Sequence, residues 1–257
     1  MSFIYAFANQ KGGVGKTTTA VNLGAYVAAK GKRTLLIDLD PQANATSSLG
    51  FDKRALSIST YDALINNTPL PDVIQLTKRV RLDLAPSSLA LSGAEVELVP
   101  MPDREKQLKR AMDAVSANYD YILIDCPPSL GLLTLNGLVA AQGVIVPVQC
   151  EYLALEGLTR LMQTIGIVRK SLNPKLTVRG LLMTMFDGRA RLSQQVVDEV
   201  RKHFPDRVFH IVVPRSVRLS EAPSYGEPIL SYAPSSPGGL AYAQLADELL
   251  AGDNGRL

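Results

Sequence analysis

The 257-residue sequence predicts an α/β fold in which a mostly parallel, twisted sheet carries helices on both faces. Short apolar runs alternate with longer segments of helical period, which is the pattern of repeated strand–helix–strand units. Most of the short runs are apolar throughout, as expected for strands that are buried on both faces. Because no long polar linker divides the chain, we expect a single domain over residues 1–257.

The predicted elements alternate along the chain. Strands are expected at residues 3–9, 34–38, 82–85, 121–125, 144–149, 180–186 and 208–213. Helices are expected at residues 17–30, 104–117, 132–141, 153–172, 193–203 and 240–251. Gly31, Gly143 and Asn173 followed by Pro174 are residue types that end helices. Residues 51–102 contain several prolines and little periodicity, and are expected to form short helices and turns within the same domain.

The composition excludes several classes of protein. With 46% hydrophobic residues, the chain can bury a sizeable core without disulfides or metals. Cys126 and Cys150 have no CxxC spacing and lie among apolar residues, so neither a disulfide framework nor a zinc site is expected and a reducing cytoplasm fits. No apolar run reaches the roughly 18 residues of a membrane span. The N-terminal apolar stretch lacks the preceding basic residues of a signal peptide.

The formal net charge of +3 conceals an uneven distribution. Residues 160–218 hold twelve Lys and Arg against four Asp and Glu, a net charge of +8, so the rest of the chain carries −5. A basic segment within an acidic body indicates a polyanionic partner. Its low aromatic content favours contacts to phosphates without reading of bases. Solvated helix faces are the alternative explanation, above all for Lys170, Arg201 and Lys202.

The strongest motif is a glycine-rich loop between an apolar strand and a helix, formed by Gln10, Lys11, Gly12, Gly13, Val14, Gly15, Lys16, Thr17 and Thr18. Glycines allow backbone N–H groups to surround phosphate oxygens, and the helix directs its positive N-terminus at them. Lys16 can reach the β- and γ-phosphates, and the Thr17 hydroxyl can ligate Mg²⁺. A glycine turn that only joined strand to helix would not require Gly-Lys-Thr here. The loop predicts a P-loop NTPase fold with a nucleotide site.

This loop departs from the usual pattern because Gln10 replaces the first glycine and Lys11 follows it. It resembles the deviant Walker A family, KGGxGK[ST], which includes the ParA/Soj partition ATPases, MinD and the nitrogenase iron protein. The resemblance implies ATP and Mg²⁺ as cofactors. It also implies that Lys11 crosses a dimer interface to the nucleotide of the other subunit, so that ATP drives homodimerisation. The alternative is that Lys11 is a solvent-exposed cation of the loop with no role at an interface.

Two predicted strands end in carboxylates, at the edge where open parallel sheets bind ligands. Asp38 and Asp40 close the second strand, and alternation puts them on one side if the chain stays extended. The resemblance assigns Asp40 to the loop that contacts Mg²⁺ and positions the attacking water. Asp125 ends an apolar strand in the manner of a Walker B motif and would hold Mg²⁺ through a water. Taken alone, Asp125 fits a strand-end cap equally well.

The chemistry of phosphoryl transfer indicates the roles of these groups. Transfer to water spreads negative charge over the γ-phosphate oxygens, so the expected catalysts are cations and hydrogen-bond donors. These are Lys16, Lys11 contributed by the other subunit, Mg²⁺ on Thr17 and the N–H groups of the loop. No strong base besides Asp40 is evident, so we infer slow hydrolysis of ATP to ADP and phosphate. The resemblance implies that a ParB-like partition-site binding protein accelerates it.

Two stretches of the basic segment, residues 184–196 and 213–226, follow predicted strands and should emerge at the same edge as the glycine loop. They resemble the ParA/Soj branch, whose members carry similar LSQQV and PRNVRLSEAPSxG runs. The resemblance implies that Pro214 and Ser216 line the adenine site. It also implies that the ATP dimer contacts DNA through basic residues, which we assign to Arg189, Arg191, Arg215 and Arg218.

The sequence departs from the ParA/Soj pattern at three positions in this region. Ser216 stands where the family more often has Asn, which bears on the contact to the base. Tyr225 and Glu227 stand where the family commonly has His and Lys, so the basic face is slightly diluted.

Taken together, the motifs predict an ATP-dependent DNA-segregation switch that is cytoplasmic, nucleoid-associated and bound non-specifically to double-stranded DNA as a dimer. The alternative is a MinD-like or protein-cluster-positioning ATPase. Membrane recruitment would need a basic amphipathic C-terminal helix, whereas residues 239–250 carry two acids and no Lys or Arg, so no membrane partner is expected. A small-molecule ligase or kinase would need an acceptor pocket, and none is evident in the sequence. An iron–sulfur reductase would need a cysteine pair at the dimer face, whereas Cys126 and Cys150 are expected to be buried. An ATP-gated DNA-binding module would hydrolyse ATP only incidentally.

Overall fold

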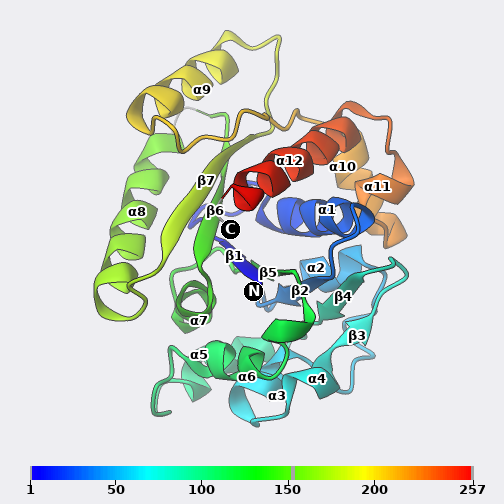
Figure 1. The fold of residues 1–257 in the computed structure, drawn as a ribbon, viewed down its shortest axis with the longest axis vertical. Helices are drawn as coiled ribbons and strands as arrows, with labels where there is room; N and C mark the ends of the chain where they lie inside the picture. The colour runs from blue at the N-terminus through cyan, green and yellow to red at the C-terminus, as the bar shows by residue number, and fades with distance from the viewer. Residues whose placement is uncertain (1, 152–153, 256–257) are drawn as a thin grey trace.

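The computed structural model describes residues 2–151 and 154–255. These residues form a seven-stranded sheet with the order β3-β4-β2-β5-β1-β6-β7 (Figure 1). Its strands are β1 (Phe3–Phe7), β2 (Thr34–Asp38), β3 (Gln75–Leu76), β4 (Leu82–Ala85), β5 (Tyr121–Asp125), β6 (Gly143–Gln149) and β7 (Thr177–Thr184). Neighbouring strands are parallel except at one edge, where β3 runs antiparallel to β4. The α/β fold is therefore confirmed.

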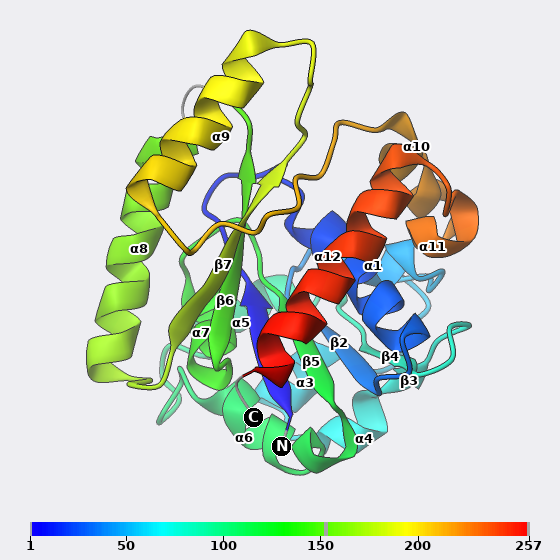
Figure 2. The ribbon, with the colours of Figure 1, turned by 45° about the horizontal axis from the view of Figure 1, so that its top comes forward.

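Helices cover both faces of the sheet, as Figure 2 shows. The longer helices are α1 (Lys16–Ala29), α7 (Leu132–Ala140), α8 (Ala154–Ser171), α9 (Arg191–His203) and α12 (Pro237–Asn254). The shorter helices are α2 (Asn44–Ser48), α3 (Thr60–Ile65), α4 (Leu70–Val73), α5 (Leu91–Glu97), α6 (Gln107–Asp113), α10 (Val217–Glu221) and α11 (Ile229–Tyr232), with 3₁₀ turns at Ser116–Asn118 and Ala222–Tyr225. Within the described residues, no helix is long and apolar enough to cross a membrane.

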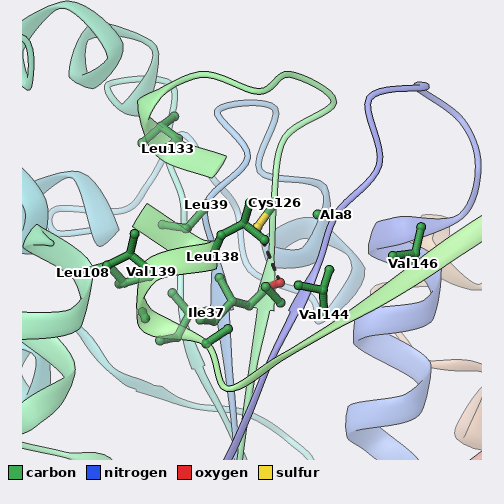
Figure 3. Close-up of a cluster of buried hydrophobic side chains, with 14 of the residues drawn as sticks. Ala8, Ile37, Leu39, Leu108, Cys126, Leu133, Leu138, Val139, Val144 and Val146 are labelled. Carbon is green, nitrogen blue, oxygen red and sulfur yellow. Dashed lines mark hydrogen bonds between the residues drawn. The ribbon is translucent and has the colours of Figure 1, made fainter. Parts of the chain in front are cut away.

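Alternate residues of each central strand belong to two separate buried clusters. In β5, Ile122 and Ile124 join a cluster that packs against α3 to α9, whereas Tyr121 and Leu123 join one that packs against α1, α10, α11 and α12. Figure 3 shows part of the first cluster, in which Ile37 and Leu39 lie near α7. Both faces are covered, which accounts for the largely apolar central strands β1, β2, β5 and β6, as the sequence predicts for most of the strands.

The register of the central strands brings three loops together. Asp125, the last residue of β5, pairs with Phe7 of β1 and with Asp38 of β2. The loops that follow these three strands therefore leave the sheet side by side at one edge. They carry the glycine loop and the predicted carboxylates.

One predicted strand is wrong. Residues 208–213 form no continuous ladder: one isolated bridge joins Val208 to Leu181 of β7, and a second joins Pro214 to Phe186, just beyond the end of β7. Between these bridges, His210 N and Ile211 N donate to the Glu248 carboxylate of α12, at 2.7 and 3.1 Å. These two N–H groups therefore do not pair with β7, although Phe209 N and Val213 N donate to Leu181 O and Met183 O, both at 2.9 Å. A side chain on a distant helix thus interrupts a strand that the apolar run predicts.

The other elements lie close to their predicted positions. Six of the seven strands form, although β7 spans residues 177–184 and not 180–186. The helix predicted at 104–117 is shorter, as α6 and a 3₁₀ turn, and α12 is longer than the predicted 240–251. Residue 153, the predicted first residue of its helix, lies outside the described residues. The two-residue strand β3 and the short helices α2, α10 and α11 were not predicted.

The C-terminal helix is anchored to the sheet by a buried ionic cluster. Asp253 is fully buried and accepts hydrogen bonds from Tyr5 Oη (2.7 Å), Tyr121 Oη (3.1 Å) and Arg179 Nε (2.9 Å). Burial, with the neighbouring Asp253 carboxylate, raises the pKa of both tyrosines, so both hydroxyls remain donors at neutral pH. The cluster joins α12 to β1, β5 and β7.

Candidate active site

The glycine loop joins β1 to α1 and is anchored at its start by Asn9. The Asn9 amide donates to Pro147 O at 2.7 Å, and its Oδ1 accepts from Lys11 N at 3.1 Å. Gly13 and Gly15 have φ values of 74° and 89°, a conformation that favours glycine. Gly15 precedes the first turn of α1 and gives it no side-chain cap, so the N–H groups of that turn are directed at an anion site.

Lys16 is the first residue of α1 and its side chain is drawn into the protein. The residue is 6% exposed, and its Nζ donates to Lys11 O at 3.3 Å. Burial lowers the pKa of Lys16, while the nearby Asp125 and Asp40 carboxylates oppose this shift. An ammonium group has three donors, so this one bond leaves capacity for phosphate oxygens.

Two adjoining cavities open beside the loop. The first, of about 420 Å³, is lined by Gly12, Gly13, Gly15, Lys16, Thr17, Thr18, Asp40, Gln42, Asn44, Ser47, Ser48, Pro128, Met185 and Pro223. The second, of about 380 Å³, is lined by Gly15, Thr18, Thr184, Met185, Val213, Pro214, Arg215, Ser216, Leu219, Ser220, Pro223 and Tyr242. They share Gly15, Thr18, Met185 and Pro223, so they form one elongated site of a size typical for small ligands.

Most residues that the sequence assigned to the nucleotide line these cavities. The glycines, Lys16, Thr17, Thr18 and Asp40 lie in the first cavity, and Pro214 and Ser216 lie in the second. Val14 is an exception, because its side chain is buried and its carbonyl oxygen accepts a hydrogen bond from Thr184 Oγ1 at 2.9 Å.

Asp125 lies beneath the first cavity and is fully buried. Neither of its carboxylate oxygens has a hydrogen-bond partner in normal geometry. Burial raises the pKa of Asp125 well above its usual range and Asp38 adds to this rise, while Thr17 and Lys16 oppose it. A carboxylate with two unused oxygens beside a threonine hydroxyl is the kind of oxygen donor set that Mg²⁺ takes, so these residues fit the predicted metal.

Asp38 and Asp40 occupy different environments. Because β2 ends at Asp38, the extended chain on which their predicted shared side depended does not continue to Asp40. Asp38 is fully buried and accepts from Asp40 N, Thr46 N and Thr46 Oγ1, at 3.1, 2.9 and 2.7 Å. Burial raises the pKa of Asp38 to about 6, and these hydrogen bonds oppose the rise. Asp40 faces the cavity, and its Oδ1 accepts from Gln42 N at 2.9 Å.

Lys11 does not line either cavity in this chain. Its side chain is 42% exposed, and its Nζ lies 3.0 Å from Glu151 Oε2. Gln149 Nε2 donates to the other oxygen of the same carboxylate. Lys11 is therefore held at the surface, beyond the end of β6.

The four arginines assigned to DNA are all exposed. Arg189 pairs with Asp187 through two hydrogen bonds of 3.1 and 3.0 Å, although its side chain is 92% exposed. Arg218 Nη1 donates to Glu221 Oε2 at 2.9 Å. Arg191 begins α9, and Arg215 donates through its backbone N–H to Phe186 O at 2.9 Å.

Several polar residues of the first cavity were not predicted from the sequence. Gln42, Asn44, Ser47 and Ser48 come from the loop after β2 and from α2. The polar run after Asp40 is the signal that could have revealed them. Met185 lies in both cavities and has a φ of 53°, which is unusual for a residue with a side chain. No sequence pattern that we used indicates that position.

Comparison with known proteins agrees with this geometry. A protein-family model described as an AAA domain matches residues 2–178. The chain is 55% identical over 251 residues to the sporulation initiation inhibitor protein Soj of Bacillus subtilis (strain 168), covering 98% of this chain and 99% of that protein. It is 52% identical over 250 residues to the chromosome-partitioning ATPase Soj of Treponema pallidum (strain Nichols), covering 97% and 98%.

A solved structure shows the same architecture with ligands bound. The structure of cobyrinic acid a,c-diamide synthase from Mycobacterium smegmatis with bound ADP and magnesium matches with a TM-score of 0.88 and 38% identity, over 99% of this chain and 96% of that one. The two Soj proteins are more similar to this chain in sequence than the synthase is. By its glycine loop, its sheet and this identity over almost its whole length, the chain belongs to the ParA/Soj family of chromosome-partitioning ATPases.

Proposed function

We propose that this chain is an ATP-dependent DNA-segregation switch. ATP binding drives sandwich dimerisation, the dimer binds double-stranded DNA non-specifically, and slow hydrolysis, stimulated by a ParB-like partner, resets the cycle. The observation that carries this proposal is the elongated site itself, which is lined by the buried Lys16 and by Asp40, with the fully buried Asp125 carboxyl close enough to Lys16 to affect its pKa.

ATP and Mg²⁺ are the ligands that these residues fit. The phosphates would lie in the first cavity, against the loop Gly12–Thr18 with its Lys16 side chain. The adenine would lie in the second cavity, beside Pro214 and Ser216. Thr17 and Asp125 would hold Mg²⁺, with Asp125 acting through a water and Asp40 near the ion. When bound, Mg²⁺ neutralises charge on the phosphate oxygens. The bound ADP and magnesium in the M. smegmatis structure support this assignment.

Hydrolysis would depend on three residues of the dimer. Asp40 faces the first cavity and is placed to orient the attacking water. Lys16 stabilises charge on the γ-phosphate from its own subunit, and Lys11 does so from the other subunit. Asp40 is the one acidic side chain among the residues that line the two cavities. Because no stronger base lies beside the nucleotide, ATP hydrolysis should be slow. Slow hydrolysis would set how long the ATP-bound dimer lasts.

Dimerisation requires Lys11 to leave Glu151. Both side chains are nearly half exposed, and exposed pairs of this kind contribute about 0–1 kcal/mol. A nucleotide polyphosphate on the other subunit offers several negative charges at close range, so it can compete with one carboxylate. ATP would thereby link nucleotide binding to subunit association.

DNA binding would use Arg189, Arg191, Arg215 and Arg218. We propose that these arginines contact phosphates and not bases, so affinity should be independent of DNA sequence and fall with salt. This proposal implies that the protein is cytoplasmic and associated with the nucleoid.

The proposal is tested by Arg218→Glu, measured by light scattering and by gel retardation of random-sequence DNA. We expect the variant to form dimers with Mg-ATP and to lose retardation, because one phosphate contact is replaced by a repulsive charge. Unchanged retardation at low salt would place the DNA surface elsewhere. Retardation of the wild-type protein that is the same with ADP and with ATP would reject the switch.

A further inference from the structure

One short segment, residues 87–95, contacts the loops that carry both Asp40 and Asp125. It leaves the carboxyl end of β4 and enters α5. Its first residue, Ser87, bonds to the Asp40 loop, and its last, Glu95, bonds to the first turn of α7, where the Asp125 loop ends. No motif of the sequence analysis includes this segment.

Ser87 is fully buried and binds the Asp40 loop from behind. Its Oγ donates to Asp40 O at 2.7 Å, and its backbone N–H donates to Thr46 Oγ1 at 2.9 Å. The same Thr46 hydroxyl donates to Asp38 Oδ2 at 2.7 Å, and Asp38 Oδ1 accepts from Asp40 N. The backbone of Asp40 is therefore held on both its N–H and its carbonyl side, while its carboxylate, whose Oδ1 accepts from Gln42 N, lines the cavity.

Glu95 lies at the other end of the segment and binds the first turn of α7. Its Oε2 accepts from Leu132 N at 2.8 Å, and its Oε1 accepts from Leu133 N at 3.3 Å. Negative charge at this position is favoured by the helix dipole. A Cβ atom on Gly131 would lie within 2.6 Å of both Glu95 oxygens, so the carboxylate also fixes the end of the loop that follows Asp125.

We propose that residues 87–95 are a clamp that positions both carboxylate loops for ATP hydrolysis, with Ser87 and Glu95 as its positioning residues. The inference rests on the proposed roles of Asp40 and Asp125. Because the segment holds backbone atoms and not the reacting carboxylates, it affects the alignment of the water and the metal more than the binding of the nucleotide. Misplacement of reacting groups by about 1 Å can reduce a rate by about 100-fold.

The test compares Ser87→Ala and Glu95→Ala with two controls, one at Ser88 within the segment and one at Glu97, two residues beyond it. Ser88→Ala removes a neighbouring hydroxyl that bonds to Ser59 Oγ at 3.0 Å, and Glu97→Gln changes a carboxylate that bonds to Tyr61 Oη at 2.7 Å. Neither control contacts a carboxylate loop through these bonds. Ser87→Ala should fold, because Asp40 O still accepts from Ala43 N at 2.8 Å.

We expect both clamp variants to lower kcat about tenfold or more while KM and the affinity for a fluorescent ATP analogue stay within about twofold. Glu95→Gln, which keeps an acceptor oxygen, should recover part of the loss. The clamp is rejected if kcat matches that of the controls, or if the affinity for the analogue falls as much as kcat. Asp40→Ala is measured in parallel. If it hydrolyses ATP normally, the proposed function fails; if it is inactive while the clamp variants are normal, only the clamp fails.

Discussion

Three aspartates at one edge of the sheet show how much a residue's surroundings determine its role. By sequence, Asp38, Asp40 and Asp125 are all acids at strand ends. In the structure, Asp38 is saturated with hydrogen bonds, Asp40 faces the cavity and Asp125 has two unused oxygens. The sequence located all three, but it could not distinguish them, because the contacts that do so, such as the two hydrogen bonds from Thr46 to Asp38, form only in the folded chain.

Lys16→Ala tests the phosphate site at this scale. We expect loss of measurable ATP binding, because a buried ammonium with free donors is removed from the phosphate cavity. Equilibrium binding of a fluorescent ATP analogue measures this, and Lys30→Ala, on the opposite end of α1, is the control. Tight binding by Lys16→Ala would contradict the assignment of the glycine loop.

Asp187→Asn tests the pairing of a proposed DNA residue. The hydrogen bonds from Arg189 lower the pKa of Asp187 to about 2, so the carboxylate stays charged at all pH values above that and competes with phosphate for Arg189. Removing the charge should raise the DNA affinity of the ATP form by roughly two- to tenfold. Fluorescence anisotropy on random-sequence DNA measures the change, with Asp198→Asn on α9 as the control. Equal affinity for both variants would mean that Arg189 does not contact DNA.

At the scale of elements, the position of the C-terminal helix α12 depends on the buried Asp253–Arg179 ion pair, which the sequence does not predict. Residues 240–251 are predicted as a packing helix, but α12 continues to Asn254 and buries Asp253 against Arg179. An isolated acid near a chain end has no pattern that marks it as buried. Its tyrosine and arginine partners lie on β1, β5 and β7, far away in sequence.

Asp253→Ala should therefore reduce the free energy of unfolding by about 3 kcal/mol, because it leaves the Arg179 charge buried without its partner. Urea unfolding followed by circular dichroism measures this loss. Asp247→Ala on the same helix removes an ion pair with Lys30. Because the Asp247 side chain is 66% exposed, this substitution should change the free energy of unfolding by no more than about 0.5 kcal/mol. Equal effects of the two substitutions would show that the buried cluster does not anchor α12.

The elements that the sequence predicted well are those with strong local patterns. The strands at 34–38, 82–85 and 121–125 form with the predicted bounds. Apolar runs end at Asp38 and Asp125, and the alternating run of residues 82–85 ends before Pro86. The segment 208–213 has the same pattern, yet Glu248 takes two of its N–H groups. The glycine loop was recognised by its residue types, whereas the Ser87–Glu95 clamp consists of contacts between distant segments and has no such motif.

Across the whole molecule, only part of the positive charge of residues 160–218 is exposed and unpaired, and so able to contact DNA. Arg179 contributes to the +8 of residues 160–218, but its side chain is 9% exposed and paired with Asp253. Arg189 and Arg218 are exposed yet paired with local carboxylates. A single subunit therefore presents a weaker positive surface than its sequence suggests. Two subunits joined by ATP would double that surface, which makes DNA affinity depend on nucleotide.

The most direct test of this account uses Asp40→Ala, in which hydrolysis should be blocked while the phosphate cavity is kept. Multi-angle light scattering and DNA retardation would be measured with excess Mg-ATP and with Mg-ADP. The account predicts a stable dimer that retards random-sequence DNA with ATP, and a monomer that does not with ADP. A monomer in excess ATP, or DNA binding that is equal with both nucleotides, would contradict it.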